Sequence, residues 1–415
     1  MHKPTHPNKP AVLVPQADSL GAIAVIRSLG QHGYQVHAAS NQTNALGCQS
    51  AFASFAHKAP AYQSEEYLPW LRQIIAQFEI KAIIPSEGFL LAIKPNFSEF
   101  SSLMDIPKDE EVVYACLSKV DVFSRFKQSD DARLAMHIPK SVIINSMDEF
   151  ASVSFTDWQL PFFVKGDAGY NRNNDDALVV RISDISSLQD EAAKALNQFE
   201  KILIQECFSG EKVTVNLLVQ DGHSLAESMV LGLHQNPHTG GVMSLRQSWW
   251  QQSIYDDAML RLKALHWNGA AMIEYKWDRE RQQFAFIELN ARYWGALNLD
   301  ILANLHFPAI QMDYFFSRQL PNSTLRLTKN ITVRHAFPTD FGYVISKIRD
   351  PSVAVQAKLI SALGFIIYFF LPRISSDLNY PGDRKLVLLN AKIFFSEIAR
   401  SLLKKCRHGF STFTK

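Results

Sequence analysis

The sequence predicts an α/β fold, and three observations support that prediction. The apolar stretch AVLVP (Ala11 to Pro15), a helix with apolar spacing and the strand YQVHAAS follow one another, which is the usual β-α-β opening of a parallel sheet. Two later stretches of strand pattern turn back on themselves at polar tips, as β-hairpins do. With 415 residues and 47% hydrophobic content, the chain is long enough for two or three domains with packed cores.

The N-terminal part continues this alternation of helix and strand. A helical pattern over residues 67–78 leads to the short strand KAIIP, which ends in Ser86-Glu87-Gly88. Because ligands of such sheets bind beyond the C-terminal ends of the strands, Glu87 is a candidate site residue, with a solvated loop carboxylate as the alternative. The turn QADSLG after the first strand lacks the GxGxxG spacing and is a weak signal for dinucleotide binding.

The middle of the chain mixes helices with hairpins. Helical patterns occupy residues 110–133, and two strand-like stretches, PFFVK and KILIQECF, enclose a further helix. The segment VTVNLLVQDGHSLAESMVLG predicts a hairpin that turns at Asp221-Gly222, and a loop rich in His, Gly and Pro follows over residues 234–241. After a helix expected at residues 257–267, AAMIEYKWDRERQQFAFIELNAR predicts a second hairpin with the charged tip DRERQQ.

The second hairpin carries the polar residues that point to chemistry. In FIELNARYWG, Glu288, Asn290 and Arg292 stand at every second position, so they share one face of the strand. Glu274 lies on the partner strand, where antiparallel pairing brings it beside them. Two carboxylates and an amide that converge in this way suit Mg²⁺, and an arginine one step further suits a phosphate or a carboxylate. The alternative is a merely wet surface strand, against which the aromatic residues directly after the motif argue.

IELNARYWG is similar to the closing motif of the ATP-grasp superfamily, in which an acidic residue and an asparagine two positions on bind Mg²⁺ and an arginine follows. Further segments resemble that superfamily in order: LSKVDVFSRFK, the x-I-P-K entry at residues 137–140, LPFFVKGDAGYN and ILIQECFSGEKVTVNLL. The resemblance implies a Rossmann-like preATP-grasp domain at residues 10–108 and an ATP-grasp domain of α+β character at residues 109–320, with its lid at 138–205. A basic, mainly helical C-terminal region would occupy residues 321–415.

The resemblance also assigns roles to individual residues. For ATP it implies Lys119, Lys165, Gln205, Glu206, Cys207, Phe208 and Glu211; for the metal, Glu274, Glu288 and Asn290; and for catalysis, Lys165 and Arg292. The hinge at residues 205–208 would offer backbone groups and an apolar wall to adenine. Lys127 is the second choice for the first lysine, and Lys212 is the alternative to Glu211 at the ribose.

These roles describe an ATP- and Mg²⁺-dependent ligase, with Mn²⁺ as the alternative ion. Two lysines and the metal would spread the charge of the transferring phosphoryl group. A small-molecule carboxylate would become an acylphosphate, held by Arg292, and an amine or similar nucleophile would displace phosphate. A phosphotransferase or carbamoyl-phosphate-type enzyme and a non-catalytic ATP-binding regulatory module are the alternatives. The lid segment KGDAGYNRNNDD argues mildly for the regulatory module, since it has two glycines, Gly166 and Gly169, in place of a Gly-rich loop; Arg172 would supply charge there.

A further segment is a candidate for substrate contact. Residues 231–250 combine Gly240-Gly241, which lets a backbone approach a ligand closely, with the polar heads of His234, His238 and Arg246. The segment is similar to one in uncharacterised ATP-grasp proteins that are associated with surface polysaccharides. Solvated imidazoles on a loop and metal binding are the alternatives for the two histidines.

Charge divides the chain unevenly. Residues 326–415 carry 15 Lys and Arg against 5 Asp and Glu, a net +10, which leaves −8 for residues 1–325. A basic tail suggests an anionic partner for that tail. The apolar run LISALGFIIYFFLP has 14 residues, fewer than the ~20 that span a bilayer, and residues 388–406 are amphipathic at helical spacing. The two interpretations are peripheral attachment to an anionic membrane surface and packing of these helices on the core.

The cysteines and the N-terminus bear on the compartment. Four cysteines without CxxC spacing predict neither a zinc site nor a disulfide framework, and the N-terminus has too short an apolar segment for a secretory signal. We therefore expect a cytoplasmic protein, either free or peripheral at the inner membrane face. The body of the chain gives no signal for nucleic-acid binding.

Overall fold

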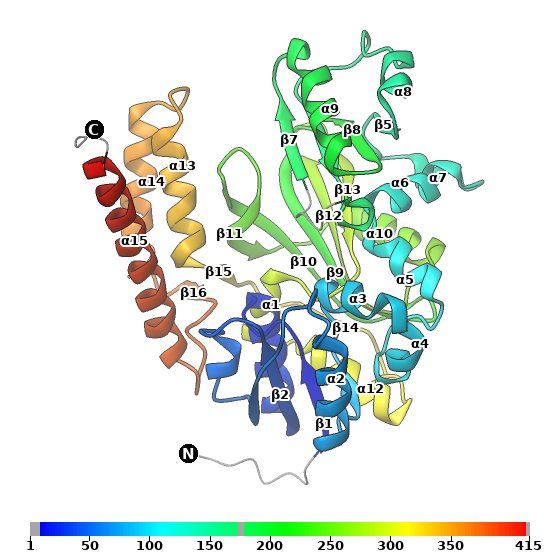
Figure 1. The fold of residues 1–415 in the computed structure, drawn as a ribbon, viewed down its shortest axis with the longest axis vertical. Helices are drawn as coiled ribbons and strands as arrows, with labels where there is room; N and C mark the ends of the chain where they lie inside the picture. Colours follow the sequence, from blue (N-terminus) through cyan, green and yellow to red (C-terminus); the bar gives the residue numbers. More distant parts are fainter. Residues whose placement is uncertain (1–8, 173–177, 412–415) are drawn as a thin grey trace.

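The N-terminal part is a parallel sheet with the strand order β3-β2-β1-β4. Figure 1 shows the computed structural model, which describes residues 9–172 and 178–411, apart from the side chains of residues 168 and 401–411. As predicted, α1 (Leu20–Gln31) joins β1 (Lys9–Val14) to β2 (Tyr34–Ser40); the further elements are β3 (Phe55–Lys58), α2 (Tyr67–Gln77), β4 (Ala82–Ile83), α3 (Glu87–Ile93) and α4 (Phe97–Phe100). Ser19 starts α1, because its hydroxyl accepts the Ala22 N–H.

The helical stretch predicted at residues 110–133 is divided into three helices. These are α5 (Glu110–Leu117), α6 (Lys119–Gln128) and α7 (Ala132–Ala135). Ser118 separates the first two: its backbone is extended, which ends α5, and its hydroxyl accepts the Asp121 N–H, which caps α6. The break places Lys119 at the first position of α6.

A second sheet, far from the N-terminal one in Figure 1, has the order β5-β8-β6-β7 with antiparallel pairings. Its elements are β5 (Ser141–Ile144), α8 (Met147–Ser152), β6 (Phe162–Gly166), β7 (Leu178–Ile182), α9 (Leu188–Gln198) and β8 (Ile202–Glu206). Helix α9 packs through Leu188, Ala192 and Ala195 against Phe162 and Ile204, so this sheet has a core of its own. We call it the lid sheet. Strands β6 and β8 and helix α9 lie where the sequence predicts them, whereas β5 and β7 were not predicted.

The central sheet has the order β13-β12-β9-β10-β11-β15-β16, and β14 pairs with β10 off this path. Its strands are β9 (Glu211–Gln220), β10 (His223–Asn236), β11 (Val242–Ser248), β12 (Gly269–Asp278), β13 (Gln283–Asn290), β14 (Leu325–Arg326), β15 (Thr332–Arg334) and β16 (Ile374–Ser376). Both predicted hairpins are present, and Asp221 and Gly222 at the β9–β10 turn both have positive φ. Helix α10 (Gln252–Ala264) begins earlier than expected, and α11 (Asn298–Leu302) and α12 (Phe307–Ser317) follow β13.

The loop predicted at residues 234–241 is mostly strand and tight turn. β10 continues to Asn236 and β11 starts at Val242, so residues 231–250 form a third hairpin. The register is irregular between Gly232 and Gln235, which disturbs the alternation of apolar and polar residues. The sequence pattern therefore did not indicate a strand there.

The C-terminal region contributes strands as well as helices. The region is mainly helical, as predicted, and in addition β15 pairs with β11 and β16 pairs with β15, so it also extends the central sheet. Helices α13 (Phe341–Arg349), α14 (Val355–Ile367) and α15 (Lys385–Ser411) stand together at one edge of the molecule in Figure 1. No helix within the described ranges is long and apolar enough to cross a bilayer. The domain boundaries at residues 108 and 320 stay predictions.

Candidate functional site

Glu274 and Glu288 lie directly opposite each other in the β12–β13 ladder. Residues paired in this way point to the same face, so two carboxylates meet on one side of the central sheet. Glu274 is buried and Glu288 is half-buried. Carboxylates this close together, with little water around them, require positive charge nearby.

Two lysines supply that charge. Lys119 Nζ lies 2.8 Å from Glu288 Oε2, and Lys212 Nζ lies 2.6 Å from Glu274 Oε2. Burial disfavours the charged form of Glu288, but Lys119 and Lys212 outweigh burial and hold the pKa of Glu288 well below its usual range. For Glu274 burial is the larger effect and raises the pKa, although Lys212 opposes it. Burial lowers the pKa of Lys119, but the carboxylates of Glu288, Glu274 and Asp167 together outweigh burial and raise it.

Lys165 extends from the lid sheet toward the same carboxylates. It lies on β6, and its Nζ donates to Gln205 Oε1 on the neighbouring strand β8 at 2.7 Å. Burial, followed by the charge of Lys119, lowers the pKa of Lys165 to about 8, while Glu288 and Glu274 oppose the shift. Three ammonium groups from three elements therefore surround two carboxylates.

Asp167 fastens the lid sheet to the helix that carries Lys119. Its buried carboxylate accepts hydrogen bonds from the Ser118 hydroxyl at 2.9 Å, the Val120 N–H at 3.1 Å and the Gly169 N–H at 2.8 Å. Since Val120 is in the first turn of α6, the carboxylate also faces the positive end of that helix. Asp167 was not predicted, and its position two residues after Lys165 is the signal that could have revealed it.

Asn290 and Arg292 extend the site toward the N-terminal sheet. Asn290 Nδ2 donates to Glu288 Oε1 at 3.0 Å, and Arg292 Nη2 donates to Asn290 Oδ1 at 3.1 Å. Arg292 Nε donates to Glu87 Oε2 at 3.1 Å, so the loop carboxylate that the sequence selected lies in this cluster. A cavity of about 230 Å³ is lined by Glu87, Lys119, Asp167, Glu288, Asn290 and Arg292, among others.

The hinge residues connect the lid sheet to the central sheet. Gln205 and Glu206 end β8, and Cys207 and Phe208 lead toward β9. The N–H groups of Glu206 and Cys207 donate to the carbonyls of residues 140 and 161, at 2.9 and 3.0 Å. Among the described residues the Phe208 N–H has no acceptor, so it is the donor that this segment can offer to a base.

The two ribose candidates point to opposite faces of β9. Glu211 forms an ion pair with Arg279 at the tip of the β12–β13 hairpin, at 3.2 Å, whereas Lys212 points to Glu274. Lys212 thus belongs to the carboxylate cluster, a position that sequence reasoning did not give it. Lys127, the second choice for the first nucleotide lysine, donates to the Ser141 carbonyl on β5.

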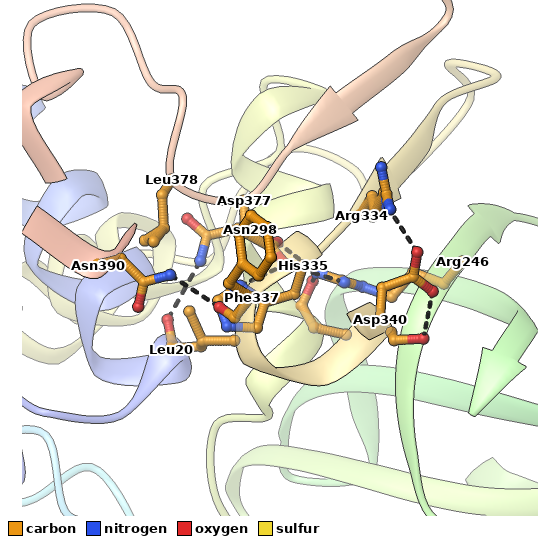
Figure 2. Close-up of polar contacts among 12 residues, drawn as sticks. Leu20, Arg246, Asn298, Arg334, His335, Phe337, Asp340, Asp377, Leu378 and Asn390 are labelled. Carbon is orange, nitrogen blue, oxygen red and sulfur yellow. Dashed lines mark hydrogen bonds and ion pairs between the residues drawn. The ribbon is translucent and has the colours of Figure 1, made fainter. Parts of the chain in front are cut away.

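The polar side chains predicted for substrate contact are held by the C-terminal region. The pairs are His234 with Asp340 at 2.8 Å, His238 with Asp350 at 3.0 Å and Arg246 with Asp377 at 3.0 Å. Figure 2 shows Arg246, Asp340 and Asp377 within a network of polar contacts that joins the central sheet to the C-terminal helices. These three side chains are therefore engaged in structural contacts in this conformation.

One glycine of the predicted pair, Gly241, does reach the site. The Gly241 carbonyl accepts a hydrogen bond from Lys212 Nζ at 2.9 Å. Gly241 has φ +154°, and a Cβ there would come within 2.2 Å of the Asn236 carbonyl oxygen, so only glycine fits. In the lid segment, Arg172 is exposed and its N–H donates to the Gln198 carbonyl at 2.9 Å, while residues 173–177 lie outside the described residues.

The donor set suits Mg²⁺ that is bound together with phosphate. It consists of oxygens from Glu274, Glu288 and Asn290, and Mg²⁺ is usually held by one or two carboxylates with substrate phosphates and water. Among the side chains that the structure describes, no three His, Cys, Asp or Glu residues gather into a metal site.

Neither a protein-family model nor a curated protein sequence matches this chain. Solved structures do share its fold. The L-amino acid ligase of Bacillus licheniformis matches with a TM-score of 0.55 at 14% identity, over 75% of this chain and 75% of that one. The N5-carboxyaminoimidazole synthetase of Staphylococcus aureus matches with a TM-score of 0.60 at 12% identity, over 80% and 83%.

A third match holds a nucleotide. The biotin carboxylase domain of the Hydrogenobacter thermophilus 2-oxoglutarate carboxylase, in complex with MgADP, ADP and bicarbonate, has a TM-score of 0.59 at 16% identity, over 79% of this chain and 74% of that one. Identities this low establish a shared fold and leave activity open. The α/β fold predicted from the β-α-β opening and the ATP-grasp fold implied by the closing motif are thereby confirmed.

Proposed function

We propose that this chain is an ATP- and Mg²⁺-dependent ligase that phosphorylates a small-molecule carboxylate and couples it to an amine. The observation that carries the proposal is the Glu274–Glu288 pair, approached by Lys119 from α6, Lys165 from the lid sheet and Lys212 from β9. Such a site combines oxygens for a divalent cation with cations for phosphates. Phosphoryl transfer depends on this positioning and charge neutralisation.

The nucleotide would bind between the lid sheet and the central sheet. The Phe208 N–H would meet the base, and Glu211 would meet the ribose. Glu274, Glu288 and Asn290 would hold Mg²⁺, which when bound supplies positive charge to the phosphoryl oxygens. Lys119 and Lys212 would then exchange their carboxylate partners for phosphate oxygens. Asp167 would keep the positions of Lys119 and Lys165 fixed relative to each other.

The carboxylate substrate would bind beside Arg292. A cavity of about 940 Å³ extends from Arg292 and Glu87 to Gln16, Ser19 and Tyr62 of the N-terminal part. The Arg292 guanidinium can bind a carboxylate or an acylphosphate through two parallel hydrogen bonds. Glu87, which contacts Arg292, is placed to hold the ammonium form of an incoming amine and to accept its proton.

The reaction would proceed in two displacements. A carboxylate oxygen of the substrate attacks the γ-phosphorus, and ADP leaves, which gives an acylphosphate. The amine nitrogen then attacks the acyl carbon, phosphate leaves, and the nitrogen loses a proton. The names of two fold relatives, an L-amino acid ligase and an N5-carboxyaminoimidazole synthetase, support this class of reaction.

Cys48, Cys116 and Cys207 are free thiols, which supports a cytoplasmic location.

The proposal is tested by trapping the acylphosphate. Purified protein is incubated with ATP, Mg²⁺, hydroxylamine and a panel of small carboxylic acids, and ADP and hydroxamate are measured. We expect ADP release that depends on one class of acid, with hydroxamate formed in step. Glu288→Gln should abolish both products, and Glu99→Gln, which removes an exposed carboxylate paired with Arg72, should abolish neither.

The same assay separates the ligase from its two rivals. Replacing hydroxylamine with amines should give an amide and an ADP yield that depends on the amine. Acid-dependent ADP without any amine-dependent product would identify a phosphotransferase. Nucleotide binding without ADP release under any condition would identify a regulatory module, and either result would overturn the proposal.

A further inference from the structure

Helix α14 exposes its apolar side chains to solvent. Its sequence VQAKLISALGFII contains one charged residue, and no residue of the helix is buried. The exposed apolar residues are Val355, Leu359, Ile360, Leu363, Ile366 and Ile367. At 3.6 residues per turn they fall on one arc of about 140° around the helix. A helix of this composition is normally covered by protein or lipid.

The exposed surface continues from α14 to α15. Phe369, just beyond α14, is 54% exposed and Phe395 on α15 is 55% exposed. Their ring centroids lie 6.1 and 5.5 Å from that of Phe337, so both rings pack against Phe337. The inner face of α14 is already used, because Phe365 packs against Phe337 and Phe341. We call the exposed residues of α14 together with Phe369 and Phe395 the α14 surface.

Buried polar contacts fix these helices on the body of the protein. Arg27 Nε lies 2.9 Å from Asp383 Oδ2, and both side chains are fully buried. Asn390 of α15 donates to the Phe337 carbonyl at 2.7 Å, a contact drawn in Figure 2. The α14 surface is therefore a fixed face of the folded protein, and its exposed apolar residues indicate contact with a partner.

The charge of the C-terminal helical region that carries this face is almost entirely positive. Between residues 341 and 400 the basic residues are Lys347, Arg349, Lys358, Arg373, Arg384, Lys385, Lys392 and Arg400, and none of them forms an ion pair with a described residue. Three of the four acidic residues in the same span, at positions 350, 377 and 383, are paired with residues of the body. Only Glu397 is left to offset the basic side chains.

We propose that the α14 surface inserts into the interface of an anionic lipid bilayer and holds the enzyme at the membrane as a monotopic protein. An exposed apolar helix face in a region rich in unpaired Lys and Arg is typical of helices that lie in the plane of an anionic bilayer. Lys358 lies in α14 itself, and Arg373 and Lys392 lie within four residues of Phe369 and Phe395. At 13 residues α14 is about 20 Å long, shorter than the hydrocarbon core of about 30 Å, so it lies in the interface and does not cross it.

A second copy of the chain fits this surface less well. Two-fold pairing would bring each α14 surface against its own copy. The unpaired basic residues around one copy would then face those around the other, and like charges across an interface oppose association. Anionic headgroups complement the same residues.

The test is sedimentation of the full chain with vesicles of phosphatidylcholine alone or mixed with phosphatidylglycerol. We expect binding to the anionic vesicles that weakens as salt rises and little binding to the neutral ones. Leu359→Gln combined with Leu363→Gln and Ile366→Gln should weaken binding by about tenfold or more. A matched control, Met136→Gln with Ile185→Gln and Leu320→Gln, changes apolar residues of similar exposure elsewhere and should bind as the wild type does.

Charge is tested with Arg349→Gln, Arg373→Gln and Lys392→Gln together, which should remove most of the preference for anionic vesicles. Sedimentation equilibrium without lipid tests the alternative, in which a second copy of the chain covers the α14 surface. A dimer that the α14 triple variant dissociates, with no vesicle binding by the wild type, would overturn the proposal in favour of a second copy. Equal vesicle binding by the α14 triple variant and the wild type would also overturn it. Neither result bears on ADP release, so the ligase proposal is tested separately.

Discussion

Lys165 should give nucleotide binding a pH dependence whose size follows from the structure. Burial and the neighbouring Lys119 lower the pKa of Lys165 to about 8, whereas the pKa of Lys119 is raised by Glu288, so Lys119 stays charged in the same range. A triphosphate prefers the protonated amine. Below pH 8 most molecules carry that charge, and it is lost as pH rises. At pH 9 about one-tenth of the free protein is charged, so the apparent Kd for nucleotide should be about tenfold higher than at pH 7.

The assay is isothermal titration of a non-hydrolysable ATP analogue with Mg²⁺ present, from about pH 6.5 to 9.5. Lys165→Arg keeps its charge throughout this range, so its affinity should be nearly constant with pH. Lys165→Met has no charge to lose, and it should bind weakly at every pH. A wild-type Kd that stays constant up to pH 9 would refute the reasoning, as would the same pH slope in Lys165→Arg.

Three further predictions concern buried acidic residues. Asp383→Ala leaves fully buried Arg27 without its partner and should lower the free energy of unfolding by about 3–5 kcal/mol in chemical denaturation; a loss below about 1 kcal/mol would contradict this account. Burial raises the pKa of Asp300 to about 7. Because this pKa exceeds the unfolded value of about 3.9, the free energy of unfolding should fall as pH rises from about 4 to about 7. Asp300→Asn should remove this part of the pH profile, and an unchanged profile would disprove the raised pKa of Asp300. Asp167→Ala should lower kcat/KM for ATP by about tenfold or more, and Ser118→Ala by less, because Asp167 also binds the α6 backbone; equal effects would show that the backbone contact is unimportant.

The carboxylate pair could be anticipated because it depends on local rules. Glu288, Asn290 and Arg292 share a face through the two-residue period of a strand, and a short hairpin brings Glu274 beside them. Lys212 could not be placed in the same way. Choosing between Glu211 and Lys212 requires knowing which face of β9 turns toward Glu274, and that depends on a pairing between strands far apart in the sequence.

Long-range contacts account for the other differences. His234, His238 and Arg246 looked free for a substrate because their partners lie 106 to 131 residues further along the chain. The C-terminal run LISALGFIIYFFLP has no polar side, so its sequence gives no means of telling which face packs on the core. In the structure one face packs through Phe365 and the other is exposed.

The central claim is that Glu274 and Glu288 hold a divalent ion together with a nucleotide. Electron paramagnetic resonance of Mn²⁺, titrated with a non-hydrolysable ATP analogue present, measures this directly. We predict about one Mn²⁺ per chain, bound tightly only with the nucleotide, and loss of that binding in both Glu274→Gln and Glu288→Gln when their folds are unchanged by circular dichroism. Wild-type Mn²⁺ affinity in either folded variant would contradict the claim.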